Sequence, residues 1–289
     1  LYNVTTMATL WHSVAARDAR LLKHQMKAIS RLPDTCLFLN YLRCHDDIGW
    51  GLDYPLLESW GMKQVPHKKY LNDFFTGKIP ESFSRGELYN EDPVTGDARF
   101  CGTTASMCGV ERAGFEMDDA GMDHGIGRIL CLHGFLFFLS GIPVLYSGDE
   151  IGQVNDYTYK DNPEKAADSR YIHRGRFHWE LTGCIKDGGS VQGRIFSGLK
   201  QMEELRRGEP LFGADARFSV RETWDDSVLC LVREQEQGKL VGIFNFHDYE
   251  RIAWIGMYQD MMTGEMLRAS AVRVDGHGFR WLKRAEAGS

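Results

Sequence analysis

The chain has 289 residues, of which 43% are hydrophobic and 26% charged, and its formal net charge is -6. This hydrophobic content can form a sizeable core, which excludes a disordered chain, and the absence of a basic cluster excludes a nucleic-acid partner. No apolar stretch reaches the roughly 18 to 20 residues of a membrane-spanning helix, so we expect a soluble protein with no membrane partner.

The cysteines and the first residue bear on where the protein is found. Seven cysteines at irregular spacing, with no Cys-x-x-Cys pair, favour reduced thiols in a cytoplasmic protein over a disulfide framework. The chain begins at Leu1 without a methionine, so we expect it to be a piece of a longer protein. Secretion therefore stays open, because a signal peptide can be judged only from the true N-terminus.

The first predicted element is a helix at residues 6–29. Leu10, Val14, Leu21 and neighbouring apolar residues fall on one side of a 3.6-residue period, which is typical of an amphipathic helix. We expect this helix to end before Pro33.

Two apolar runs follow that each end in charged residues. The run at 37–44 stops at His45, Asp46 and Asp47, and Gly49 follows. Flanking proline and glycine favour a strand over a helix. The run at 141–152 has the same design, and because parallel strands deliver their carboxyl ends to one edge, we expect a shared functional rim.

Nearly a hundred residues separate these runs, far more than one loop and one helix require. We therefore predict an inserted subdomain that covers the rim, with a helix at 66–75 inside it. A helix at 123–139 leads into the second strand, and a long polar loop at 153–187 and a helix at 191–205 follow that strand.

This alternation of helices and strands specifies a parallel sheet with right-handed crossovers. Two strands cannot bury such helices, so we expect the rest of the sheet to be missing from this chain or supplied by another. After residue 210, short alternating runs separated by turn residues predict an antiparallel β-sandwich.

Four motifs together carry a resemblance to a known family: HDDIGW at 45–50, GDAR at 96–99, GIPVLYSGDEIG at 141–152 and ADSRYIHR at 167–174. With the β-rich tail they resemble the C-terminal half of the α-amylase superfamily, and most of all its amylosucrases. The resemblance runs along essentially the whole chain, weakly in the sandwich.

The resemblance implies an α/β plus all-β fold, namely the C-terminal portion of a (β/α)8 TIM barrel with an inserted lid and a following antiparallel β-sandwich. Helix 6 and strand 7 of the barrel would lie in residues 1–48, and the lid in 49–119. Helix 7, strand 8 and helix 8 would lie in 120–209, and the sandwich in 210–289.

Amylosucrases are retaining enzymes that transfer the glucosyl unit of sucrose to an α-glucan, using an aspartate nucleophile on the fourth strand and a glutamate acid/base on the fifth. The resemblance implies that both residues lie in the N-terminal remainder of the barrel, which this chain needs as a partner and without which it is inactive. Asp46 would be the third carboxylate, which stabilises the oxocarbenium-like transition state.

The resemblance also implies four sugar-binding residues: His45, Asp47, Arg99 and Arg170. His45 would donate to a sugar hydroxyl, Asp47 and Arg170 would form the floor of the glucosyl pocket, and Arg99 would line the fructosyl and acceptor side. The plain alternatives are a histidine that caps the strand, a surface ion pair for Arg170 and an ordinary loop arginine at 99. We expect no cofactor and assign no metal ligand.

Two neighbouring features have other interpretations. Asp149 and Glu150 resemble structural residues that close the loop after the eighth strand, so we leave them out of the site. Lys68 or Lys69 stands where amylosucrases have a lid arginine that contacts the glucan, and a lysine cannot reproduce the planar fork of a guanidinium.

Other functions remain open. A sucrose hydrolase shares HDDIGW, so transfer and hydrolysis are not separated, and other glycosidases of the superfamily are possible. A non-catalytic paralogue that acts as a binding subunit is an alternative of another class. A metal-dependent phosphohydrolase also carries a His-Asp doublet, but it needs further histidines at ligand spacing, which His12, His24 and His133 do not provide.

Overall fold

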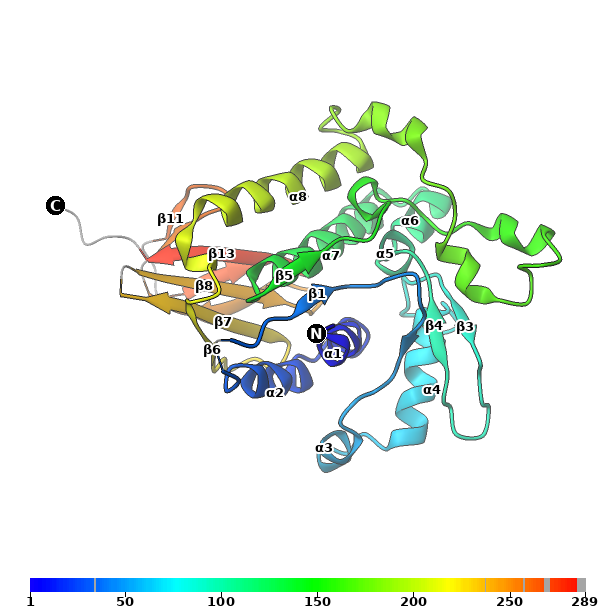
Figure 1. Cartoon of the computed structure of the whole chain (residues 1–289), viewed down its shortest axis with the longest axis horizontal. Helices are drawn as coiled ribbons and strands as arrows, with labels where there is room; N and C mark the ends of the chain where they lie inside the picture. Colours follow the sequence, from blue (N-terminus) through cyan, green and yellow to red (C-terminus); the bar gives the residue numbers. More distant parts are fainter. Residues whose placement is uncertain (34, 237, 257, 268–270, 285–289) are drawn as a thin grey trace. The chain divides into compact units, whose positions relative to one another are not determined.

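The computed structural model describes residues 1–33, 35–236, 238–256, 258–267 and 271–284 (Figure 1). The chain forms two compact units. Unit 1 consists of Leu1–Asn40, Leu130–Val144 and Gly198–Ser289, and unit 2 consists of Tyr41–Ile129 and Leu145–Ser197. Among the described residues, none of the helices is both long enough and apolar enough to cross a membrane.

The α-helices are α1 (Val4–Ala16), α2 (Arg20–Ile29), α3 (Tyr54–Ser59), α4 (Gln64–Phe75), α5 (Thr104–Met107), α6 (Val110–Glu116), α7 (Asp119–Phe138) and α8 (Val191–Gly208). The strands are β1 (Leu39–Tyr41), β2 (Ile48–Gly49), β3 (Glu87–Tyr89), β4 (Arg99–Cys101), β5 (Ile142–Val144), β6 (Arg217–Arg221), β7 (Val228–Gln235), β8 (Gly238–Asn245), β9 (Arg251–Trp254), β10 (Tyr258–Asp260), β11 (Met266–Leu267), β12 (Ala271–Val274) and β13 (Phe279–Arg284). Short 3-10 helices are η1 (Asp149–Ile151), η2 (Tyr157–Asp161), η3 (Ser169–His173), η4 (Trp179–Cys184) and η5 (Pro210–Phe212).

The prediction of one helix at residues 6–29 is wrong, because the chain breaks between α1 and α2. Arg17 adopts a left-handed conformation with φ 53° and ends α1. The Asp18 carboxylate then accepts a hydrogen bond from the Arg20 main-chain N–H at 2.8 Å and pairs with the Arg20 guanidinium. No glycine or proline marks this break, and the apolar residues keep the same helical period on both sides of it. The sequence therefore predicted a single helix.

Three adjacent chain segments in unit 1 make the predicted parallel arrangement. Tyr2 pairs in parallel with Leu39, and β1 pairs with β5. The Ile142 N–H donates to the Phe38 carbonyl at 2.8 Å, and β1 and β5 run in the same direction in Figure 1. The strands predicted at 37–44 and 141–152 are therefore present, although each is only three residues long.

The turn from α7 into β5 depends on Gly141. Its φ is +104°, and a Cβ there would lie 2.3 Å from the Phe38 carbonyl oxygen, so glycine is required. The Arg206 guanidinium donates to the carbonyls of Leu139 at 3.1 Å and Gly141 at 2.8 Å, and it also bonds the Phe137 carbonyl. These bonds satisfy acceptors that the end of a helix leaves unpaired.

The C-terminal part of unit 1 is antiparallel, in agreement with the predicted sandwich. One sheet has the order β11-β10-β13-β8-β7-β6, and a second pairs β12 with β9. Both sheets contribute to one hydrophobic cluster, which contains Val241 and Ile243 of β8 together with Val272 and Val274 of β12. Strands β10, β11 and β13 were not predicted from the sequence.

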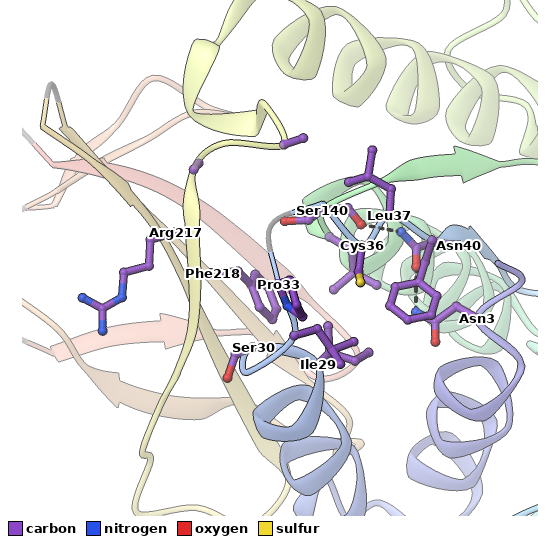
Figure 2. Close-up of a pocket in the computed structure, with 15 residues that line it drawn as sticks. Asn3, Ile29, Ser30, Pro33, Cys36, Leu37, Asn40, Ser140, Arg217 and Phe218 are labelled. Carbon is purple, nitrogen blue, oxygen red and sulfur yellow. Dashed lines mark hydrogen bonds between the residues drawn. The ribbon is translucent and has the colours of Figure 1, made fainter.

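Unit 1 also contains a pocket, shown in Figure 2, beside the amino ends of β1 and β5. Two side-chain hydrogen bonds join residues that line it. Asn3 Nδ2 donates to Asn40 Oδ1 at 2.7 Å, and Asn40 Nδ2 donates to the Ser140 carbonyl at 2.9 Å. Parallel barrels carry their chemistry at the opposite, carboxyl ends of the strands, and none of the predicted site residues lines this pocket. We therefore do not assign it as the functional site.

Unit 2 is built around the three-stranded sheet β2-β4-β3. The Trp50 indole stacks on Phe100 of β4 at 4.7 Å between ring centroids and donates a hydrogen bond to Asn72 of α4 at 2.9 Å. Residues 145–197 belong to this unit together with residues 41–129. Ser169 Oγ donates to the Leu88 carbonyl at 2.9 Å, which ties the polar loop to β3.

Candidate functional site

Asp47 and Arg99 are brought together by strand register. Gly49 of β2 lies opposite Arg99 of β4, and Asp47 comes directly before β2. Since Gly49 has no side chain, the stem of Arg99 can lie across it, with Arg99 Cγ 3.7 Å from where a Cβ would be. Arg99 Nε then lies 3.1 Å from Asp47 Oδ2.

A second guanidinium lies near the other carboxylate oxygen of Asp47. Arg170 Nη1 lies 3.9 Å from Asp47 Oδ1. The Asp168 carboxylate holds Arg170 in place by accepting from Nε and Nη2, each at 2.8 Å, and the guanidinium lies over the Tyr89 ring at 4.5 Å. This fork lowers the pKa of Asp168 and raises the pKa of Arg170. The Asp47 side chain is 12% exposed and lies close to both guanidiniums.

Asp46 and His45 are more open to solvent. The Asp46 side chain is 55% exposed, with Oδ2 3.4 Å from His45 Nε2 and Oδ1 3.5 Å from Arg174 Nη2. Neither distance is that of a tight ion pair, so the carboxylate oxygens can still accept hydrogen bonds from a ligand.

The main chain under this pair is fixed by two side chains of the 167–174 segment. The His45 carbonyl accepts from Arg174 Nε at 2.6 Å and from His173 Nε2 at 3.2 Å. The Gly102 N–H donates to His173 Nδ1 at 3.2 Å, so the proton of the neutral imidazole is on Nε2. Burial, and then the Arg43 cation, lower the pKa of His173 to about 4, which keeps the ring neutral at physiological pH.

A buried ion pair joins Arg43, which precedes the HDDIGW motif, to Asp149. Arg43 Nη2 lies 2.7 Å from Asp149 Oδ1, and Thr104 Oγ1 donates to Asp149 Oδ2 at 2.9 Å. Both charged side chains are almost fully buried, and the Arg43 guanidinium lies over the Tyr146 ring at 4.3 Å. Asp149 is therefore engaged in internal contacts. Glu150 Oε2 accepts from the Gly148 N–H at 2.8 Å.

All five predicted site residues lie in unit 2. Two connected groups contain them: His45 and Asp46 with Arg174, and Asp47 with Arg99 and Arg170. Sequence reasoning missed Arg174 and His173 as supports, although both stand in the ADSRYIHR motif. Both side chains bond the main-chain carbonyl of His45. Every residue type has such a carbonyl, so the sequence at position 45 does not indicate the contact.

Lys68 has a structural engagement that the sequence did not reveal. Its Nζ lies 2.9 Å from Asp97 Oδ1, above the Tyr54 ring at 5.0 Å, and its side chain is largely buried. The ammonium is thus already paired within the unit.

The arrangement suits the recognition of hydroxyl groups. Exposed carboxylate oxygens of Asp46 accept hydrogen bonds from hydroxyls, whereas the guanidinium and imidazole groups around it donate to hydroxyl oxygens. Two further guanidiniums lie near Asp47 and supply additional hydrogen-bond donors beside it.

Comparison with known proteins gives similarity in sequence and similarity in fold. No protein-family profile matches the chain. The chain is 29% identical over 120 residues to the glucosylglycerate phosphorylase of Escherichia coli (strain K12), a stretch that covers 41% of this chain and 21% of that protein.

Three solved structures resemble nearly the whole chain. Sucrose 6F-phosphate phosphorylase from Thermoanaerobacter thermosaccharolyticum matches with a TM-score of 0.60 and 18% identity, over 95% of this chain and 46% of its own. AmyP in complex with maltotriose matches with a TM-score of 0.57 and 12% identity, over 96% and 49%. Cyclic alpha-maltosyl-(1→6)-maltose hydrolase from Arthrobacter globiformis matches with a TM-score of 0.54 and 15% identity, over 98% and 44%. The chain thus spans less than half the length of each of these relatives.

Proposed function

We propose that this chain, whose fold is that of part of an α-amylase-superfamily enzyme, supplies the glucosyl-binding side of a retaining enzyme that transfers glucose from sucrose. The observation that carries the proposal is the exposed Asp46 carboxylate, held beside His45 on a main chain that His173 and Arg174 fix. The fold matches support the superfamily and do not single out the amylosucrases.

In this proposal Asp46 accepts hydrogen bonds from neighbouring ring hydroxyls of the glucosyl unit. These bonds strengthen as positive charge develops on the ring, which favours the transition state over the bound substrate. His45 donates to an adjacent hydroxyl. Asp47, Arg99 and Arg170 form a charged floor whose geometry is set by strand register and by the Asp168 fork.

The nucleophile and the acid/base would come from the N-terminal remainder of the barrel, so the proposal concerns the full-length enzyme. The amylosucrase resemblance favours an α-glucan as the glucosyl acceptor. The cysteine pattern favours a cytoplasmic enzyme.

A second acceptor has its own support. Two of the matched proteins are by name phosphorylases, one of glucosylglycerate and one of sucrose 6F-phosphate. With inorganic phosphate as the acceptor, sucrose would be cleaved to fructose and glucose 1-phosphate. The half-exposed Arg99 guanidinium beside Asp47 is a donor that could contact either acceptor.

The test incubates full-length enzyme with sucrose alone, with phosphate and with a glucan, and measures fructose, glucose, glucose 1-phosphate and glucan length. We expect fructose in each case, faster with the true acceptor. No fructose under any condition would contradict the proposal, and sugar binding without turnover would favour the non-catalytic binding subunit.

Asp46→Asn tests the central residue. The amide keeps the shape of the side chain but loses the charge, so we expect turnover to fall by about 100-fold or more. Glu180→Gln, at an exposed position paired with His178, is the matched control and should leave turnover unchanged. Near-normal rates in Asp46→Asn would overturn the assignment.

A further inference from the structure

Three consecutive side chains at the site offer different metal-binding atoms. The Cys44 sulfur, a ring nitrogen of His45 and a carboxylate oxygen of Asp46 all lie within 4.8 Å of one another. Thiolate, imidazole and carboxylate are the donors that bind Zn²⁺ in proteins. In tetrahedral coordination neighbouring ligand atoms are separated by roughly 3.5 Å. The most widely separated of these three atoms would therefore need to approach each other by about 1 Å.

The local geometry permits this convergence. The Asp46 main-chain N–H donates a hydrogen bond to Cys44 Sγ at 3.4 Å. This bond holds the sulfur close to the main chain of the next two residues. Asp46 Oδ2 lies 3.4 Å from His45 Nε2 while Oδ1 lies on the side of Arg174, so one carboxylate oxygen and the imidazole already have the separation of neighbouring ligands. The side chains of His45 and Asp46 are mostly exposed and can rotate to close the site.

We propose that Cys44, His45 and Asp46 bind a borderline or soft divalent cation, Zn²⁺ or Cd²⁺, with the fourth position open to solvent. Binding releases the Cys44 proton to solvent, and the thiolate and carboxylate then balance the charge of the cation. We do not expect Mg²⁺ or Ca²⁺ to bind here, because these cations require oxygen ligands and only Asp46 supplies one.

This site shares His45 and Asp46 with the glucosyl site, so cation and sugar exclude each other. That consequence rests on the proposed function. The full-length enzyme would then be inhibited reversibly by Zn²⁺ in competition with sucrose, and a chelator would restore its activity.

The test measures binding directly, independently of turnover. Full-length protein is titrated with Zn²⁺ by calorimetry and with Co²⁺ by absorbance, where a thiolate ligand gives a charge-transfer band in the near ultraviolet. We expect Cys44→Ser to abolish the band and both Cys44→Ser and His45→Ala to weaken Zn²⁺ binding at least about tenfold, since even indirect supports of a metal are worth that much.

Cys184→Ser is the matched control, because Cys184 is an exposed thiol in η4 outside the trio, and it should bind as the parent protein does. His45→Ala, at an exposed side chain, keeps the test decisive if Cys44→Ser folds poorly. Unchanged binding in either Cys44→Ser or His45→Ala would overturn the proposal. Binding that needs Cys44 but does not weaken with sucrose would support the metal site and contradict the proposed sugar site.

Discussion

Arg170 shows how one side chain can be part of both a fold and a site. Its fork with Asp168 and its position over Tyr89 fix the guanidinium before any ligand binds, and its remaining nitrogen faces Asp47. Such preorganisation lowers the cost of ordering a side chain on binding. Arg170 therefore does form an ion pair, as the plain alternative allowed, and its partner is Asp168. This pair leaves the third guanidinium nitrogen directed toward Asp47 of the HDDIGW motif.

For Arg170→Ala in the full-length enzyme we expect KM for sucrose to rise about tenfold or more while kcat changes less. The reason is that lost hydrogen bonds to a charged donor are worth about 1.5 to 3 kcal/mol in binding. Arg207→Ala, at an exposed pair with Glu203 on α8, is the control and should leave steady-state kinetics as they are. If both variants behave like the parent, Arg170 has only a structural role.

His173 makes stability depend on pH. Its folded-state pKa of about 4 is below the ordinary 6.5, so between these values the unfolded chain binds more protons than the folded one. The contribution is fully present above pH 6.5 and is lost as pH falls toward 4, and it amounts to a few kcal/mol at about 1.4 kcal/mol per pH unit.

We expect His173→Gln to flatten the loss of stability between pH 6.5 and 4, because glutamine does not titrate, while an amide N–H can still donate to His45. Urea unfolding at pH 7 and pH 5 measures this. His178→Gln, at an exposed histidine, should keep the parental pH dependence. A steep pH dependence that survives in His173→Gln would assign the effect to another group.

At the residue level, sequence motifs identified side chains that the structure brings close together, while their sugar-binding roles stay a prediction. HDDIGW, GDAR and ADSRYIHR named Asp47, Arg99 and Arg170, and the structure places these three in contact. The supports of His45 were missed, since a main-chain carbonyl can be bonded by any donor and leaves no mark in the sequence.

At the level of elements, the turn between α7 and β5 combines two requirements. Gly141 has a backbone conformation and a close approach to Phe38 that exclude a side chain, and Arg206 holds the carbonyls around it. Burial lowers the pKa of Arg206 to about 10, so the guanidinium stays charged at neutral pH. This turn sets the start of β5.

Gly141→Ala should destabilise the protein by about 3 kcal/mol or more, or prevent folding, because the new Cβ meets a carbonyl and the φ is unfavourable. Gly208→Ala, in open space at the end of α8, should change the free energy of unfolding by less than about 1 kcal/mol. Denaturant unfolding of both variants gives the comparison, and equal effects would show that the turn can relax.

Elements with a strong period were predicted well and irregular ones were not. The helix expected at 66–75 is α4, and the helix expected at 123–139 is α7. The break at Arg17 was missed because an arginine carries no turn signal, and β13 was missed because its Phe279 to Arg284 run mixes buried and charged residues.

At the scale of the whole molecule, the parallel segments expose apolar side chains that such sheets normally cover. Ile142 of β5 is 56% exposed, and Leu1 and Tyr2 are more exposed still. Parallel sheets are usually covered on both faces, so under the proposed barrel fold we expect further strands of the whole protein to cover β5.

The test compares two isoleucines of similar exposure in the chain. In the full-length protein Ile142→Ser should cost about 1 to 3 kcal/mol of unfolding free energy if β5 is covered. Ile252→Ser on β9, which is 46% exposed in the antiparallel sheets, should stay within about 0.5 kcal/mol. Equally small losses would mean that β5 remains at the surface.

The two hydrogen bonds to the His45 carbonyl have a consequence for protein engineering. Because His173 and Arg174 hold the peptide that carries Asp46, substitutions at 173 and 174 would, under the proposed function, shift Asp46 without removing a proposed sugar-binding residue. A directed-evolution library that tests the proposed function should therefore diversify residues 173 and 174 first and leave Arg170 and residues 45–47 intact.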